Sequence, residues 1–252
     1  MRASALAVLI AVILTSCSIK ETRRECPCIF EIDLSAFEEV SQKVSLDLNG
    51  KILSVAIGCQ DSLKAVLSAP KSPTANVSVW SGVSRMRFSG GVLEVPAGEQ
   101  SDSLFLFGAS VPGDQETVCL KAVPHKQFAS VLLRIADAPF YEKFEVKSNY
   151  GGIELTRGDA AEGNLFIPLE GVEGEHCFRL PRQGAGGLLV LEASDGYGNV
   201  HQYPLGEWIL GAGYDWDALD LADIAVAADF TLGRFEVSVQ EWERGAARDQ
   251  IL

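Results

Sequence analysis

The stretch Val44-Ser45-Leu46-Asp47-Leu48-Asn49-Gly50 decides the fold, because apolar and polar residues alternate along it and it ends in an Asn-Gly pair. Strict alternation places every second side chain on one face of a β-strand. Asn and Gly both tolerate the positive φ that a two-residue hairpin turn requires. The stretch therefore predicts a β-hairpin with one buried face.

Short alternating strands of the same kind recur along most of the chain. Upstream, Phe30, Ile32 and Leu34 alternate with Glu31 and Asp33. The other predicted strands are residues 77–80, 86–88, 104–109, 117–122, 131–135, 144–146, 165–169, 177–180, 188–193, 200–203, 224–230 and 235–239. Many short strands separated by Gly and Pro turns predict an all-β protein. Residues 61–67 are the one predicted helix.

The strand rhythm restarts after Val123-Pro124, which divides the chain into two similar parts. Each part is long enough to bury its own core. We therefore expect two antiparallel β-sandwich domains in tandem, residues 28–123 and 124–252, with a boundary near residues 121–126.

The N-terminus has the pattern of a bacterial lipoprotein signal. Arg2 supplies a positive charge, residues 3–14 form a short apolar run, and Leu14-Thr15-Ser16-Cys17 follows. Such a run is typical of a secretory signal and is too short to span a bilayer comfortably. We expect residues 1–16 to be removed, Cys17 to be the lipidation site, and residues 17–27 to form a lipidated tether.

The charge balance limits the partners. The formal net charge is −13, and nucleic acid or anionic lipid would require a basic surface. No segment after Cys17 offers 18 uninterrupted apolar residues, the length that a membrane-spanning helix needs. The sequence therefore predicts no nucleic-acid partner and a membrane link through N-terminal acyl chains.

The remaining cysteines leave their pairing open. An exported protein meets an oxidising compartment, where one or two disulfides would form and at least one thiol would be left over. Cys26-Pro27-Cys28 has neither a second cysteine pair nor a histidine at ligand spacing, so we expect no metal site. The five cysteines other than Cys17 are Cys26, Cys28, Cys59, Cys119 and Cys177.

No catalytic or cofactor-binding signature stands out. The sequence contains neither a P-loop nor a Gly-x-Ser-x-Gly elbow, and His125, His176 and His201 stand far apart.

We interpret Arg157-Gly158-Asp159 as an ordinary turn rather than an adhesion motif. The acidic residues Asp215, Asp217, Asp220 and Asp223 are interpreted as a solvated connection rather than a Ca²⁺ site. The tryptophans Trp80, Trp208, Trp216 and Trp242 suit core packing better than a sugar-stacking platform.

Several segments together carry a family resemblance. They are the signal ending at Cys17, Arg23 and Arg24, Cys26-Pro27-Cys28 with residues 29–34, Val79-Trp80-Ser81-Gly82, Asp195-Gly196 with Tyr203-Pro204-Leu205-Gly206, Gly213-Tyr214-Asp215-Trp216, residues 219–223 and the last hairpin ending in Trp242. On these residues the chain resembles the FimB-like fimbrial anchor lipoproteins of Gram-negative anaerobes.

The resemblance implies two transthyretin-like sandwiches and a non-catalytic role. Such proteins hold the base of a fimbrium on the outer membrane and influence its length, with a structural pilin subunit as partner. Lys20-Glu21 is similar to signals that send lipoproteins to the cell surface. Pilin subunits of this class join by β-augmentation, in which one chain adds a strand to the sheet of another. The competing hypothesis is a surface lipoprotein that binds glycans through its tryptophans.

Overall fold

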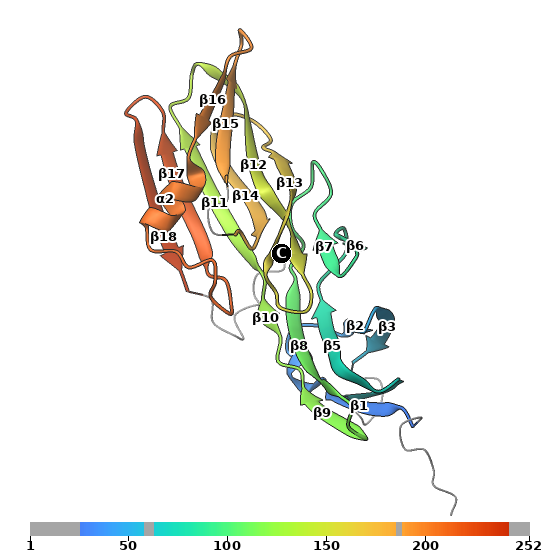
Figure 1. The fold of residues 1–252 in the computed structure, drawn as a ribbon. Coiled ribbons are helices and arrows are strands. Elements are labelled where there is room, and N and C mark those ends of the chain that lie inside the picture. The colour runs from blue at the N-terminus through green and yellow to red at the C-terminus, as the bar shows by residue number, and fades with distance from the viewer. Residues whose placement is uncertain (1–25, 58–62, 185–187, 242–252) are drawn as a thin grey trace, which may run out of the picture.

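The computed structural model describes residues 26–57, 63–184 and 188–241, and these are nearly all β-structure (Figure 1). The one α-helix in these ranges is α2 (Leu205–Gly211), and a single 3-10 turn, η1 (Ser35–Phe37), follows the first strand. The strands are β1 (Cys28–Asp33), β2 (Lys43–Leu48), β3 (Lys51–Ala56), β4 (Lys64–Ala69), β5 (Ser72–Ser81), β6 (Arg87–Ser89), β7 (Val92–Glu94), β8 (Phe105–Gly113), β9 (Thr117–Lys121), β10 (His125–Lys126), β11 (Phe128–Ala136), β12 (Tyr141–Glu154), β13 (Ala160–Pro168), β14 (Gly174–Pro181), β15 (Val190–Asp195), β16 (Val200–Tyr203), β17 (Asp223–Asp229) and β18 (Arg234–Gln240).

The first half of the molecule is a sandwich of two sheets. Their strand orders are β4-β1-β9 and β10-β8-β5-β2-β3. Phe30 and Ile32 of β1 meet Leu46 of β2 and Val79 of β5 in one apolar core. The predicted hairpin is confirmed: β2 pairs with β3 across Asn49 and Gly50, whose φ values are 51° and 84°.

The second half is a second sandwich with its own core. Its sheets run β14-β11-β17-β18 and β16-β15-β12-β7-β6, with β13 beside β12. Leu133 of β11, Phe144 of β12 and Val226 of β17 are among the buried residues between them. The predicted fold class, two β-sandwiches in tandem, is therefore confirmed.

The chain passes between the two cores more than once. Met86, Leu93 and Leu104 precede the predicted boundary in sequence, yet they belong to the second core. The short strands β6 and β7 join the sheet of β12 before β8 returns to the first sandwich (Figure 1). The division at residues 121–126 stays a prediction.

The structure differs from the sequence-based expectation at two places, one where a predicted helix is a strand and one where a helix was not expected. The predicted helix at residues 61–67 lies partly outside the described residues, and its remainder enters strand β4, which pairs with β1 along six residues. Ala65 and Ala69 are buried there, so pairing and burial override a weak local preference for helix. Helix α2, which packs Leu205 and Ile209 into the second core, was not predicted.

Candidate functional site

Strand β1 is the first described strand after the predicted tether, residues 17–27. Cys17 itself lies outside the described residues. Strand β1 is the central strand of its sheet, antiparallel to β4 and parallel to β9. The side chains of Phe30 and Ile32 have 0% exposure, and Leu34 next to the strand is also buried. Strand β1 is therefore part of the core of the first sandwich.

On the outer face of this sheet one acidic residue lies between two lysines. Asp33 of β1 lies opposite Lys64 of β4 and Lys121 of β9. The backbone N–H of Ser35 donates a 2.9 Å hydrogen bond to the Asp33 carboxylate. This bond, together with the Ser35 side chain and the two lysines, lowers the pKa of Asp33.

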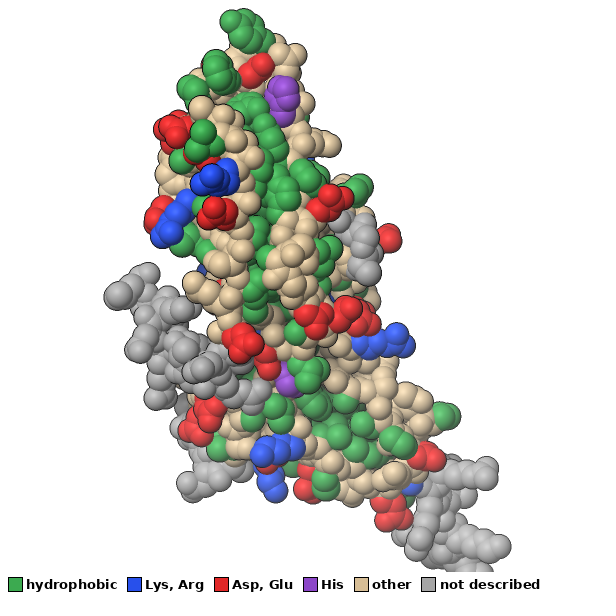
Figure 2. All heavy atoms as spheres, turned by 90° about the vertical axis from the view of Figure 1, so that its left-hand side faces the viewer, with side chains coloured by type: hydrophobic (Ala, Val, Ile, Leu, Met, Phe, Trp, Pro, Cys, Tyr) green, Lys and Arg blue, Asp and Glu red, His purple; other side chains and the backbone are tan. Residues whose placement is uncertain are grey.

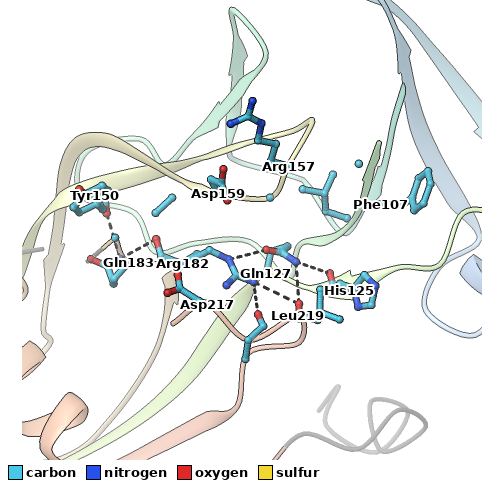
Figure 3. Close-up of a pocket in the computed structure, with 16 residues that line it drawn as sticks. Phe107, His125, Gln127, Tyr150, Arg157, Asp159, Arg182, Gln183, Asp217 and Leu219 are labelled. Atoms are coloured by element: carbon cyan, nitrogen blue, oxygen red, sulfur yellow. Dashed lines mark hydrogen bonds between the residues drawn. The ribbon is translucent and has the colours of Figure 1, made fainter. Parts of the chain in front are cut away.

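A polar cleft of about 600 Å³ lies where the two sandwiches meet (Figure 3). Residues from β8, β10, the β12–β13 turn, the segment after β14 and residues 217–219 line it. The labelled lining residues are Phe107, His125, Gln127, Tyr150, Arg157, Asp159, Arg182, Gln183, Asp217 and Leu219. The cleft thus combines aromatic rings with acidic, basic and amide groups.

Arg182 forms the floor of this cleft and is only 7% exposed. Its Nε donates to Gln127 Oε1 at 3.0 Å, Nη1 donates to the Trp216 carbonyl, and Nη2 donates to the Ala218 carbonyl at 2.7 Å. Burial lowers the pKa of its guanidinium, although Asp217 and other acidic groups nearby oppose that shift. Arg182 therefore connects the segment after α2 to Gln127, which lies between β10 and β11.

A buried lysine, Lys126, belongs to the same contact region between the two sandwiches, which we call the junction. Lys126 Nζ lies 2.6 Å from Asp223 Oδ1, donates to the Leu221 carbonyl at 3.0 Å, and sits 4.7 Å above the ring of Phe128. Burial lowers the pKa of Lys126, and the hydrogen bond and charge of Asp223 act against that shift. Asp220 accepts the backbone N–H of Lys126 at 2.7 Å. The junction is thus locked by groups from distant parts of the sequence.

The acidic run at residues 215–223 is therefore only partly a solvated connection. Asp215 and Asp217 are exposed as expected, but Asp220 and Asp223 bind the junction. The sequence interpretation is wrong for these last two because their partner, Lys126, is more than ninety residues away.

A second carboxylate, Asp102, holds the segment that crosses between the sandwiches. Its Oδ2 accepts the backbone N–H groups of Ser84, Arg85 and Met86 at 2.8, 2.7 and 2.9 Å. Burial alone would raise the pKa of Asp102, but these three bonds and the Ser84 hydroxyl together lower it. Neither Asp102 nor Arg182 was predicted as an organising group, because burial and partners are properties of the fold.

The tripeptide Arg157-Gly158-Asp159 forms the turn between β12 and β13, as predicted. Gly158 has a φ of 76°, and its N–H donates to the Glu154 carbonyl at 2.8 Å. The turn lies beside Gln127, since a Cβ at Gly158 would come within 3.3 Å of that side chain. It lines the cleft, and the side chains of Arg157 and Asp159 are exposed there (Figure 3).

The three described tryptophans support the packing interpretation. Trp80 and Trp216 are buried in the second core, and half-buried Trp208 stacks on Phe235 of β18 with ring centres 4.0 Å apart. Trp242 lies outside the described residues. Trp208 and Phe235 belong to the face of α2 and β18, over which Figure 2 shows a band of apolar side chains.

Histidines and cysteines form no cluster in the described part of the chain. His125 on β10 pairs with Asp220 at 3.2 Å, while His176 and His201 belong to β14 and β16. Four cysteines are free thiols: Cys28 is buried, and Cys26, Cys119 and Cys177 are exposed. Cys59 falls outside the described ranges. Those ranges hold no group of three or more His, Cys, Asp or Glu side chains suited to a metal ion, and no helix in them is long and apolar enough to cross a membrane.

Solved structures from Porphyromonas and Bacteroides species have a similar fold. The fimbrial anchor protein Mfa2 of Porphyromonas gingivalis matches with a TM-score of 0.59 and 13% identity, over 86% of this chain and 98% of that one. A Bacteroides thetaiotaomicron protein provisionally assigned to polysaccharide binding matches with a TM-score of 0.58 and 12% identity, over 90% and 100%. A provisional adhesin from Bacteroides ovatus matches with a TM-score of 0.54 and 12% identity, over 89% and 96%.

These likenesses confirm the predicted resemblance at the level of the fold. No protein-family model matches the sequence, and no curated protein does so either.

Proposed function

We propose that the protein is a surface lipoprotein that holds the base of a fimbrium on the outer membrane without catalysing a reaction. The observation that carries this proposal is the position of β1. The strand begins eleven residues after Cys17 and is fully buried along one face, between two neighbouring strands. A lipid on Cys17 would therefore be coupled to the core of the fold through a short tether.

The membrane end of this arrangement depends on acylation. Two or three acyl chains anchor a protein stably to a bilayer, whereas one chain binds only marginally. The net charge of −13 offers no attraction to anionic lipid. Acyl chains on Cys17 thus supply the membrane attachment in this proposal.

The partner end would use an open sheet edge. Within the described residues β18 pairs with β17 alone, so its outer row of backbone N–H and C=O groups has no strand beside it. An extended segment of a pilin subunit would satisfy these groups by β-augmentation. The fold shared with the anchor Mfa2 supports this assignment of the partner class.

Removal of the protein tests the proposal. A strain that lacks it should still polymerise fimbriae but shed them into the medium, with altered lengths visible by electron microscopy. Radiolabelled fatty acid should enter the wild-type protein and fail to enter Cys17→Ala. Normal retention of fimbriae in the deletion strain, with no second anchor present, would reject the anchor function.

The cleft between the sandwiches favours glycan binding as the second candidate. Tyr150 and Phe107 are half-buried aromatic residues, while the charged residues Arg157, Asp159 and Asp217 are exposed around them. Rings that stack on sugars and charged groups that bind hydroxyls are typical of carbohydrate sites. Calorimetric titration with neutral oligosaccharides, compared between wild type and Tyr150→Ala, separates the two candidates. Binding that Tyr150→Ala abolishes, together with retained fimbriae in the deletion strain, would favour the glycan function.

A further inference from the structure

Among the strand pairings in the described residues, two are parallel and the others are antiparallel. In the first sandwich β1 runs parallel to β9, from Ile29 opposite Thr117 to Asp33 opposite Lys121. In the second, β11 runs parallel to β17. Parallel neighbours start at the same end of a sheet, so the start of one strand and the finish of the other lie at opposite ends of the pair.

The β1–β9 pair has a different connection at each of these opposite ends. The tether leads into the start of β1 at Cys28, and the chain leaves the finish of β9 toward β10 and the second sandwich. Figure 1 shows the start of β1 near one extreme of the molecule and the β15–β16 turn at the other. A pull between these extremes would draw β1 along its own axis past β9.

Such a pull loads all the hydrogen bonds between β1 and β9 at the same time, rather than breaking them one after another. At the tether end the Ile29 N–H donates to the Glu116 carbonyl at 3.0 Å, and at the far end the Ala122 N–H donates to the Asp33 carbonyl at 2.9 Å. Had β9 been antiparallel to β1, its finish would lie beside the tether and the same pull would peel the strands apart.

Strand β1 is also held by β4 on its other edge and by the packing of its buried face against the core. It pairs with β4 along six residues, so both edges must slide together. Phe30 and Ile32, both fully buried, would have to move across the core as the strand slides.

The second sandwich repeats the arrangement. The β11–β17 pair runs from Val131 opposite Ile224 to Ala136 opposite Asp229. Strand β11 enters from the junction, and β17 finishes at the turn before β18. In this pair too, the start of β11 and the finish of β17 lie at opposite ends.

We propose that the fold bears tension between its N-terminal end and the second sandwich, with the parallel pair β1–β9 as its mechanical clamp. The inference rests on the proposed anchoring function, because a fimbrial base is pulled in this direction whenever the fimbrium is dragged away from the cell. Forced unfolding is governed by the unfolding rate under load, so resistance depends on the direction of pull and not on stability alone.

Single-molecule force spectroscopy on the mature chain tests the clamp by changing only the direction of pull. One handle is attached at residue 17 in both cases. The second handle is a peptide ligation tag inserted either at Tyr197, which is 94% exposed in the β15–β16 turn, or at Asp114, which is exposed in the β8–β9 turn. The Asp114 position lies beside the start of β9, so this pull peels β1 from β9.

The clamp predicts a higher rupture force for the Tyr197 handle than for the Asp114 handle at the same loading rate. Equal forces, or a lower force with the Tyr197 handle, would overturn it. Chemical unfolding of the two tagged proteins serves as the control. If their unfolding curves coincide, a difference in rupture force arises from the direction of pull and not from a difference in stability. Because the measurement uses purified protein, its failure is distinguishable from failure of the anchor function, which is decided by fimbriae on cells.

Discussion

The first and last described strands of the chain are built in opposite ways. Strand β1 has a neighbour on each side and buries Phe30 and Ile32 completely. Strand β18 has one neighbour among the described strands, and its inward residues Phe235, Val237 and Val239 are only half-buried. The difference indicates that β1 is held on both edges and on its buried face, whereas β18 leaves one edge open.

The open edge nevertheless carries features that limit unwanted pairing. Arg234 and Glu236 place charges on β18, and Trp208 of α2 covers its inner face at Phe235. Charged side chains and a covering helix are common protections of an edge strand. An edge of this kind suits a specific partner better than random association.

The contrast in burial predicts the largest effect on stability. Phe30→Ala should lower the free energy of unfolding by about 3–5 kcal/mol, the usual cost of removing a buried phenylalanine ring. Phe235→Ala, which removes the same ring from the half-buried position, should cost clearly less. Urea unfolding of the mature chain followed by circular dichroism measures both. Equal losses would show that β18 is held as firmly as β1.

The junction allows the second sandwich to be weakened while β1 stays unchanged. Lys126→Met leaves Asp223 at the start of β17 without its 2.6 Å partner. Removing one member of a buried ion pair typically costs about 3–5 kcal/mol. We place this effect below that of Phe30→Ala because Asp223 also accepts the Ser130 N–H and is partly exposed.

The matched control for the junction is Arg85→Met. It breaks the exposed Arg85–Glu99 pair of similar length, and such surface pairs contribute about 0–1 kcal/mol. Equal losses in Lys126→Met and Arg85→Met would contradict a structural role for the junction pair.

Acid should weaken the segment of residues 84–86, which crosses between the sandwiches, because protonation of Asp102 weakens its hydrogen bonds to that segment. Because the folded-state pKa of Asp102 is lowered from 3.8, its contribution to stability is present above that value and is lost as the pH falls through the folded-state pKa. Asp102→Asn replaces an acceptor of three N–H groups and should cost about 1–3 kcal/mol at neutral pH.

Thermal melting across the acidic range measures this contribution. The variant should show a flatter decline of melting temperature with falling pH than the wild type. Parallel declines would show that another carboxylate controls the acid response.

The smallest effect on the fold is expected from cutting the tether. Arg23 and Arg24 precede β1, so cleavage there removes no strand residue. A chain cut with trypsin under native conditions at these sites should melt at the temperature of the intact protein. In cells the tether should remain uncut, because cleavage would separate the fold from its lipid. N-terminal sequencing that finds the surface-bound form starting at Arg24 or Glu25 would contradict this.

Local pattern predicted the strands well where both alternation and turn residues were present. The hairpins β2–β3 and β17–β18 follow directly from residues 44–50 and 224–239. Alternation shows which face of a strand is buried but not which strand lies beside it. The parallel pairs and the crossing strands β6 and β7 were therefore beyond prediction.

The junction was hidden for a related reason. Lys126 and Asp223 look like ordinary surface residues in the sequence, and only the fold brings them to 2.6 Å. Likewise α2 begins after Pro204 without a side-chain cap, so the usual signals for a helix start were weak.

The central claim is that one molecule joins the lipid on Cys17 to the fimbrial base, and a strain that carries Cys17→Ala tests it most directly. The measurement is the amount of pilin in washed cells and in culture supernatant, compared with the wild-type strain. The account predicts that pilin moves to the supernatant together with the unlipidated protein, because the folded domains still bind the fimbrium. Fimbriae that stay on the Cys17→Ala cells in normal amount would contradict it.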